Sequence, residues 1–259
     1  MKEGQKLWTR EELILAINLY CKIPFGRMHH GNPLIIEFAN LIGRTPSSVT
    51  FKLGNLASFD PSLQARGIKG TVNASKLDKE IWDEFSQDWD KTLLQSETLL
   101  ATKNNSTIEK LNHVEFADLP KDGLEKERLV KTRVNQSIFR TVVLATYNSR
   151  CCITGVDNTE LLIASHIVPW SKDDKNRLNP MNGLCLNALH DRAFDSGLIA
   201  ISPEDYSVIL SPQLKKKKVV TPAIESNFIA YDHKQIILPD KFLPLPEFLD
   251  YHYQHIFRK

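Results

Sequence analysis

Residues 163–197, IASHIVPWSKDDKNRLNPMNGLCLNALHDRAFDSG, decide the fold of the second half of the chain. The apolar, β-favouring residues before Pro169 predict a strand, with His166 near its end. After a turn at NPMNG, the run NGLCL predicts a second short strand. Asn187 can then cap a helix whose first turn carries His190. A strand, a loop, a strand and a helix fold as a hairpin with a helix laid across it, so we expect the two histidines to face one another.

The residue types in this stretch suit hydrolysis of a phosphodiester. A neutral imidazole, with an ordinary pKa of about 6.5, can take a proton from water at physiological pH. A divalent cation held by an imidazole or a carboxylate can offset the charge that develops on the phosphate and on the departing 3′ oxygen. The chemistry leaves two interpretations open: one histidine as base and the other as metal ligand, or two histidines with hydrogen-bonded structural roles.

Length and composition place the chain among globular proteins. With 259 residues, 42% of them hydrophobic, it can bury a substantial core, and the usual domain size of about 150 residues suggests two units. No apolar run approaches the ~20 residues of a membrane span, and the amino terminus is charged, so we expect a cytoplasmic protein without membrane contact. The four cysteines include no C-x-x-C pair, which favours reduced thiols over disulfides or structural zinc. The net charge of +2 neither requires nor excludes a nucleic-acid partner.

The amino-terminal residues predict a set of short helices. Thr9 and Glu12 form a capping-box signature for the first helix, and a later helical run ends at Gly43. The turn RTPSS feeds another helix, so the two form a helix-turn-helix candidate, with an ordinary helical hairpin as the alternative. The residues of this last helix that we expect to be exposed, and whose types contact phosphates and base edges, are Ser47, Ser48, Thr50, Lys52 and Asn55.

The middle of the chain predicts a domain boundary. Residues 76–93 indicate one acidic helix that packs an aromatic stripe on the first domain, and the segment after it loses clear periodicity. We therefore predict a helical DNA-binding domain over residues 1–95, a linker over 96–125 and a second domain over 126–259.

The second domain is expected to begin with a helix and to contain a further pair of strands. Residues 126–148 have helical periodicity, and their polar side chains either bind DNA or form a solvated face; the candidates are Arg133, Gln136 and Arg140. GLIAIS and YSVILS alternate like antiparallel strands. The run KKKK at 215–218 beside them either helps to hold a polyanion or is simply solvated. LPEFLDYHYQHIF predicts a final helix that packs on this domain.

The order of the residues is more specific than their types. The segment CCITG…LLIASHIVPW…NPMNGLCLNALHDRAFDSGLI resembles the HNH endonuclease family, in particular its branch of predicted bacterial restriction endonucleases. The resemblance runs from about residue 133 to residue 198 and includes RVNQSIFRTVVLATYNSR upstream. WTREELILAINLY and NPLIIEFANLIGRTPSSVTFKLGN resemble the domain that often precedes the nuclease in this branch.

The resemblance implies a role for each matching residue. His166 matches the general base that activates water, and Asn182 matches the asparagine that braces the loop and orients that base. His190 matches the last histidine, a metal ligand. The sequence departs from the family at Ser165, where many members have a second metal ligand, and a hydroxyl is a weaker ligand than a carboxylate for a hard cation.

Acidic and basic neighbours complete the predicted site. Asp191 and Asp195 are the nearest acidic substitutes for the missing ligand, and Asp195 is preferred, with a structural role as the alternative. Arg177 and Arg192 are candidates for phosphate contacts, with plain surface charge as the alternative. Mg²⁺ is the expected ion and Mn²⁺ a substitute, because one imidazole with oxygen donors lacks the usual ligand set of zinc.

We therefore expect an α+β protein with an amino-terminal, helix-turn-helix-like domain, a linker and a carboxy-terminal ββα-metal HNH nuclease domain. The resemblance implies metal-dependent hydrolysis of DNA, leaving a 5′ phosphate and a 3′ hydroxyl, with a role in defence against foreign DNA. One such site cuts one strand, so cleavage of both strands calls for a homodimer or for two successive nicks. The alternatives are a DNA-binding regulator with an inactive HNH fold and an RNA-cutting HNH nuclease.

Overall fold

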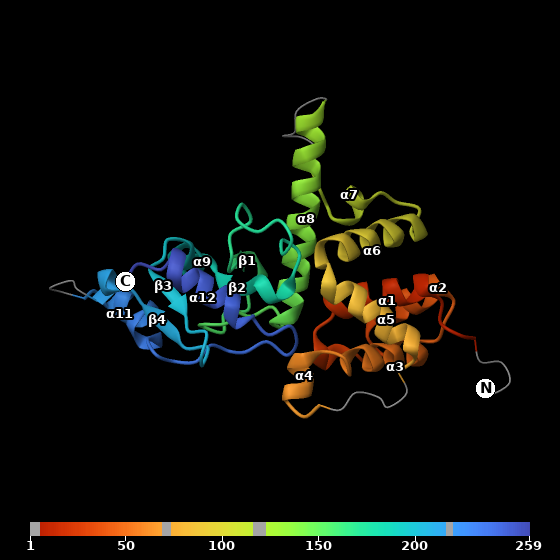
Figure 1. The fold of residues 1–259 in the computed structure, drawn as a ribbon, viewed down its shortest axis with the longest axis horizontal. Helices are drawn as coiled ribbons and strands as arrows, with labels where there is room; N and C mark the ends of the chain where they lie inside the picture. The colour runs from red at the N-terminus through yellow and green to blue at the C-terminus, as the bar shows by residue number, and fades with distance from the viewer. Residues whose placement is uncertain (1–5, 69–73, 116–122, 216–219) are drawn as a thin grey trace. The chain divides into compact units, whose positions relative to one another are not determined.

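The computed structural model describes residues 6–68, 74–115, 123–215 and 220–259 (Figure 1). The chain divides into two compact units, Met1–Val142 and Val143–Lys259. The described part of the first unit is helical, and the second unit combines helices with two small antiparallel sheets. The predicted α+β class is therefore confirmed. In the described ranges, no helix combines the length and the apolar character that a membrane span needs.

The division between the units falls within a helix and not within the predicted linker. That linker, residues 96–125, includes the end of one helix, the whole of a second and the first residues of a third, and residues 116–122 lie outside the described ranges. Helix-capping residues account for this order: Thr107 accepts a hydrogen bond from the backbone N–H of Lys110 and so begins a short helix where the composition had suggested a loop. The limits of the functional domains stay a prediction.

The first unit is built around helix α1. This helix contacts four of its neighbours, and its residues from Glu12 to Cys21 are buried. The helices are α1 (Arg10–Lys22), α2 (Pro33–Ile42), α3 (Pro46–Ala57), α4 (Pro61–Ala65), α5 (Lys76–Gln87), α6 (Trp89–Lys103) and α7 (Ile108–Leu111), with α8 (Leu124–Thr146) extending across the division.

The ends of these helices follow the residues that were expected to cap them. Thr9 and Glu12 form the predicted capping box at α1. Gly43 ends α2 with a left-handed φ of 67°, a conformation that glycine adopts without the steric cost of a Cβ atom. The single helix expected at 76–93 is wrong, because the backbone leaves helical geometry at Asp88, which then caps α6 by accepting from the N–H of Lys91.

The second unit contains the stretch quoted at the opening. Strand β1 (Leu162–His166) pairs antiparallel with β2 (Gly183–Asn187), so that His166 lies opposite Gly183 and Leu162 opposite Asn187. Asn187 also caps α9 (Ala188–Asp195) by accepting from the backbone N–H of His190. Because α9 contacts both strands, the predicted order of strand, loop, strand and helix is confirmed.

A second hairpin and a carboxy-terminal helix complete this unit. Strands β3 (Ile199–Ile201) and β4 (Val208–Leu210) pair as predicted, and α12 (Pro246–His255) contacts β3. Two short helices, α10 (Pro212–Lys215) and α11 (Pro222–Asn227), lie between β4 and α12 in the chain. Of the basic run at 215–218, Lys215 forms an ion pair with Asp232, and the other lysines lie outside the described ranges.

Candidate active site

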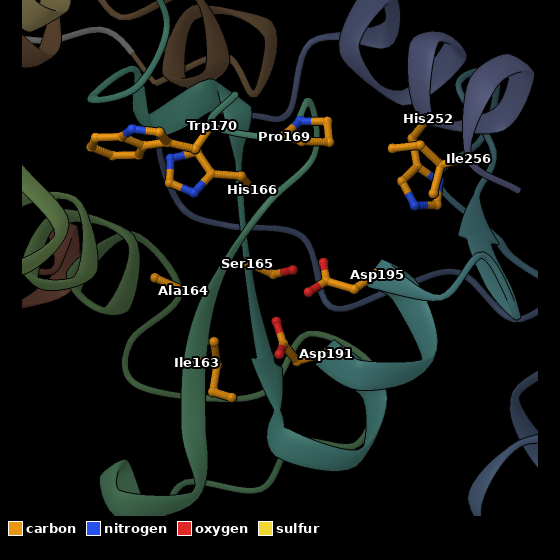
Figure 2. Close-up of a pocket in the computed structure, with 10 residues that line it drawn as sticks. All are labelled: Ile163, Ala164, Ser165, His166, Pro169, Trp170, Asp191, Asp195, His252 and Ile256. Carbon is orange, nitrogen blue, oxygen red and sulfur yellow. The ribbon is translucent and has the colours of Figure 1, made fainter. Parts of the chain in front are cut away.

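A pocket of about 440 Å³ lies where β1, the loop after it, α9 and α12 meet (Figure 2). Its polar side chains come mainly from β1 and α9, and most of its apolar wall comes from β1, from the residues after it and from α12. The lining residues are Ile163, Ala164, Ser165, His166, Pro169, Trp170, Asp191, Asp195, His252 and Ile256.

His166 ends β1 with its imidazole held in one orientation. Its Nε2 lies 2.9 Å from the carbonyl oxygen of Arg177, and the edge of the ring meets Trp170 at a centroid distance of 5.4 Å. A carbonyl oxygen only accepts, so Nε2 carries the proton and Nδ1 carries the lone pair of the neutral ring. Burial lowers the pKa of His166, and the hydrogen bond to Arg177 only partly opposes this effect. The imidazole is therefore neutral at physiological pH.

Two carboxylates from successive turns of α9 face Ser165 on β1. Figure 2 shows the side chains of Asp191 and Asp195 directed toward one another and toward the Ser165 hydroxyl. Their spacing of four residues places them on one face of the helix. Burial raises the pKa of both groups, and the charge of Asp191 raises that of Asp195 further.

The hydroxyl of Ser165 is buried at this cluster. The residue is 3% exposed, and its Oγ forms no hydrogen bond of normal geometry within the described residues. It is nevertheless close enough to Asp191 to oppose the rise of that residue's pKa. A buried hydroxyl without a hydrogen bond of normal geometry, beside two carboxylates, can still donate to or coordinate a ligand.

These groups fit a hard divalent cation. Mg²⁺ prefers oxygen donors, and it is commonly bound through one or two carboxylates while it keeps several waters. A cation would also relieve the unfavourable burial of the negative charges on Asp191 and Asp195. Within the described residues, no group of three or more His, Cys, Asp and Glu side chains could hold a metal. The donors available here are therefore two carboxylates and a hydroxyl, which suit magnesium better than zinc.

Asn182 fastens the loop between the two strands. Its Oδ1 accepts from the N–H of Val168 at 2.8 Å, and its Nδ2 donates to the carbonyl of Val168 at 3.2 Å and to that of Asn176 at 3.2 Å. Asn182 is 1% exposed, so these bonds satisfy polar groups that water does not reach. The same loop carries the carbonyl of Arg177 that orients His166, and the geometry is thus compatible with the bracing role expected of Asn182.

His190 does not lie in the pocket, so the expectation that the two histidines face one another is wrong. Its Nε2 lies 2.7 Å from the carbonyl oxygen of Asn227, and its Nδ1 lies 3.0 Å from Oδ1 of Asn187. Burial lowers its pKa. Successive residues of an α-helix point about 100° apart. The turn that directs Asp191 toward β1 therefore directs its neighbour away, and the role of His190 as a metal ligand stays a prediction.

Two of the basic residues expected to bind phosphate lie in the second unit. The guanidinium of Arg177 lies over the ring of Trp170 at 5.1 Å, and its Nε donates to the Trp170 carbonyl at 3.2 Å. Arg192 is exposed on α9, and its charge lowers the pKa of Asp191 and Asp195 against the effect of burial.

The other predicted DNA-binding residues lie in the first unit. On α8, Arg133 donates to the carbonyl of Glu115 at 2.9 Å, Gln136 is exposed and Arg140 is half-buried. On α3, Ser47 is exposed and Ser48 is half-buried.

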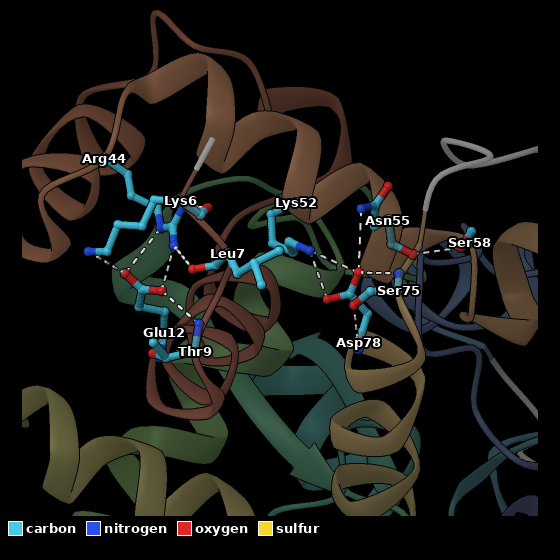
Figure 3. Close-up of polar contacts among 10 residues, drawn as sticks. All are labelled: Lys6, Leu7, Thr9, Glu12, Arg44, Lys52, Asn55, Ser58, Ser75 and Asp78. Atoms are coloured by element: carbon cyan, nitrogen blue, oxygen red, sulfur yellow. Dashed lines mark hydrogen bonds and ion pairs between the residues drawn. The ribbon is translucent and has the colours of Figure 1, made fainter. Parts of the chain in front are cut away.

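Lys52 and Asn55 are buried, so their predicted exposure is wrong. The ammonium of Lys52 donates to both carboxylate oxygens of Asp78, at 2.7 and 2.8 Å (Figure 3). Asp78 is fully buried and also caps α5 by accepting from the N–H of Ser75. Such a carboxylate requires a cation, because an unpaired charge in the interior is costly. The sequence pattern placed Lys52 on the outer face of α3, but α3 contacts α5 on that side.

The sequence pattern gave little weight to Asp191 and did not assign several other lining residues to the site, among them Trp170, His252 and Ile256. The spacing of four residues between Asp191 and Asp195 indicated that both lie on one face of the helix. Trp170 ends the apolar run that contains His166, and its position beside Pro169 was a signal that it lies near that histidine. His252 and Ile256 carry no comparable signal, because their helix reaches the pocket only through tertiary packing.

Residues 151–202 match the family model of the HNH endonucleases. This part of the chain is an HNH endonuclease domain. The match spans about a fifth of the chain and confirms the resemblance drawn from the ordered motif. It includes every pocket residue except His252 and Ile256. HNH nucleases generally use divalent metal ions. No curated protein matches the chain.

Substitution of Asn182 by alanine is expected to loosen the loop after β1. The change leaves the buried N–H and carbonyl of Val168 without their side-chain partner, at a cost of about 1–3 kcal/mol. Amide exchange of Val168 should accelerate accordingly. Asn158→Ala is the matched control, since it removes an exposed cap and should cost less than about 1 kcal/mol. Unchanged protection of Val168 in Asn182→Ala would contradict the bracing role.

Substitution of Lys52 by methionine tests whether this lysine is structural. It leaves the carboxylate of Asp78 buried and unpaired, so the free energy of unfolding should fall by about 3–5 kcal/mol. Lys79→Met removes a lysine from an exposed ion pair with Asp83 and should change stability by less than about 1 kcal/mol. Urea denaturation of both variants gives the comparison. Equal, small losses would return Lys52 to the candidates for DNA contact.

Proposed function

We propose that the protein is a metal-dependent DNA endonuclease in which His166 is the general base. The proposal is based on one observation: the neutral imidazole of His166 and the carboxylates of Asp191 and Asp195 line the same pocket. A base and an anionic pair in one cleft of this volume supply the groups that metal-assisted phosphodiester hydrolysis needs. The HNH endonuclease domain supports a nuclease in general, and the DNA substrate and the identity of the base are our proposals.

His166 acts on the attacking water. Its Nδ1 takes one proton from that water while the water oxygen forms a bond to phosphorus, and the bond between phosphorus and the 3′ oxygen breaks. The departing oxygen gains a proton from solvent, which leaves a 5′ phosphate and a 3′ hydroxyl. The carbonyl of Arg177 accepts from the Nε2–H of the neutral ring, so that the lone pair lies on Nδ1 until this nitrogen takes the proton of the water. Asn182 is a positioning residue that holds the loop carrying this carbonyl.

Asp191, Asp195 and the hydroxyl of Ser165 are the groups that would hold the cation, Mg²⁺ or Mn²⁺. When bound, the ion supplies positive charge that offsets the charge developing on the phosphate and on the leaving oxygen. His190 remains the alternative ligand. Its burial, the 2.7 Å contact of its Nε2 with the carbonyl of Asn227 and its position outside the pocket lining favour the carboxylates over it.

Several surfaces are proposed to contact DNA. Arg177 is close to His166 and has its guanidinium fixed on Trp170, and exposed Arg192 flanks the carboxylates; both suit phosphate contacts. The helical first unit is proposed to add contacts through a helix-turn-helix at α2 and α3. Its candidates are Ser47 and Ser48, together with Arg133, Gln136 and Arg140 on α8. A defence role in the cytoplasm, and cleavage of both strands by a homodimer or by successive nicks, complete the proposal.

A plasmid-nicking assay tests the proposed activity. Supercoiled DNA with Mg²⁺ or Mn²⁺ should be nicked by the unaltered chain and left intact with a chelator. His166→Ala should lower the rate by about 10²-fold or more, because the base is lost. His30→Ala, which changes an exposed histidine of the first unit, should leave the rate unchanged.

The other outcomes of the assay select the alternatives. Nicking by His166→Ala at the unaltered rate would exclude the proposed base. Cleavage of single-stranded RNA but not of duplex DNA would overturn the proposed substrate. Binding of DNA in a gel shift without cleavage under any metal, on both plasmid and phage DNA, would favour the regulator.

The pH dependence of cleavage follows from the pKa shifts. The base must be unprotonated, so the rate falls as the pH drops through the pKa of His166, which burial places below its ordinary value of 6.5. Asp191 and Asp195 also lose their charge on acidification, from pKa values that burial raises above 3.8. The acid limb of the rate at saturating Mg²⁺ should therefore lie below pH 6.5. A half-maximal rate above about pH 7 would contradict a buried, neutral base.

A further inference from the structure

The carboxy-terminal helix α12 lies outside the matched residues 151–202 and still forms part of the pocket wall. His252 and Ile256 line the pocket beside Asp195, as Figure 2 shows. The family match therefore does not include the whole of the site. Helix α12 also contacts α9, through His252 and Phe194.

The backbone after α12 is packed directly on the turn that ends α9. A Cβ atom at Gly197 would lie 2.1 Å from the carbonyl oxygen of Ile256, and Gly197 has a left-handed φ of 68°. The N–H of Arg258 donates to the Gly197 carbonyl at 2.9 Å, and Ser211 donates to the Arg258 carbonyl at 2.6 Å. The backbone at Ile256 and Arg258 is thus held against the turn that follows α9. It lies so close to Gly197 that a side chain at position 197 would not fit.

His252 makes the corresponding contact from within α12. Its ring lies flat on the ring of Phe194, with centroids 3.7 Å apart and an interplanar angle of 10°. Its Nε2 lies 3.1 Å from the carbonyl oxygen of Phe194, the residue before Asp195. Because that oxygen only accepts, Nε2 carries the proton and donates. Burial lowers the pKa of His252 to about 4, which agrees with a neutral ring.

Packing alone would not favour a histidine at this position. The Nδ1 of His252 is buried and has no hydrogen-bond partner within the described residues. A buried acceptor without a partner lowers stability, and a phenylalanine would keep the stacked ring without that loss. The property that distinguishes His252 from an apolar ring is therefore the N–H directed at Phe194.

We propose that His252 is a positioning residue of the nuclease site, whose Nε2–H bond to the Phe194 carbonyl holds the last turn of α9 with Asp195 directed at Asp191 and Ser165. Helix α9 has only 8 residues, and helices of this length have little stability of their own. The N–H of Gly197 also donates to the Phe194 carbonyl at 2.9 Å, so His252 supplies a second donor, from another element, to the last turn of α9. The inference rests on the proposed function, because it takes Asp191 and Asp195 as the groups that hold the cation.

Two variants of the 259-residue chain separate the hydrogen bond from the stacking. His252→Gln keeps an N–H donor in place of Nε2 and loses the ring, and His252→Phe keeps the ring and loses the donor. The affinity for Mn²⁺ alone, measured by titration calorimetry, is the first readout. We expect His252→Phe to raise the Kd by about tenfold or more and His252→Gln to change it by less than about threefold. Both should melt within a few degrees of the unaltered chain.

Nicking kinetics provide the second readout. At saturating Mg²⁺ the maximal rate of His252→Phe should recover, while the Mg²⁺ concentration for half-maximal rate rises, because the residue acts through the position of Asp195. Unaltered Mn²⁺ affinity in His252→Phe would overturn the proposal. Equal losses in both variants would also overturn it, since the ring and not the donor would then be decisive.

Asp195→Asn distinguishes failure of this inference from failure of the proposed function. If the unaltered chain binds Mn²⁺, Asp195→Asn loses it and His252→Phe does not, the positioning role alone is wrong. If the unaltered chain binds no Mn²⁺, or if Asp195→Asn binds as tightly as the unaltered chain, the proposed metal site is wrong and the role of His252 falls with it.

Discussion

The antiparallel register of β1 and β2 decides which side chains the pocket receives. It places His166 opposite Gly183 and Leu162 opposite Asn187. Side chains alternate along a strand, so a slip of one residue would exchange the directions of Ser165 and His166. The same pairing puts Asn187 at the point where its side chain caps α9 and so sets the rotation of that helix over the strands. His166 on the strand and the carboxylates on the helix thus depend on one set of backbone hydrogen bonds.

Buried hydrogen bonds then hold the loop after β1 and the last turn of α9 in place beside the paired strands. Asn182 satisfies the backbone of Val168 on one side of the pocket, and His252 donates to Phe194 on the other. Each contact lies where water does not reach, so removing one partner leaves a group unpaired at a cost larger than the net gain of an exposed hydrogen bond. In the first unit, Lys52 and Asp78 obey the same rule between α3 and α5. In both units, buried hydrogen bonds and ion pairs therefore hold neighbouring elements in place, because water cannot replace the missing partner when one is removed.

Local sequence signals predicted the elements well and the directions of their side chains less well. Thr9, Gly43 and Asn187 marked helix ends because capping depends on residues only a few positions apart. The ordered motif predicted the HNH domain for a similar reason, since its spacing reflects one strand, loop, strand and helix. Lys52 is buried because α5 packs against its side of α3, and His190 contacts Asn227 instead of lying in the pocket with His166. Both depend on which element packs against each face of a helix. That information is not present in the periodicity of a single segment.

Crystals grown with Mn²⁺ would show whether Asp191 and Asp195 hold the metal ion. An anomalous difference map recorded at the manganese edge locates the ion without reference to any assumed ligand. We predict a peak between the carboxylates of Asp191 and Asp195 and beside Ser165, with His190 still bonded to the carbonyl of Asn227. A peak at His190, with that carbonyl displaced, would exclude the carboxylate site and make the histidine the ligand.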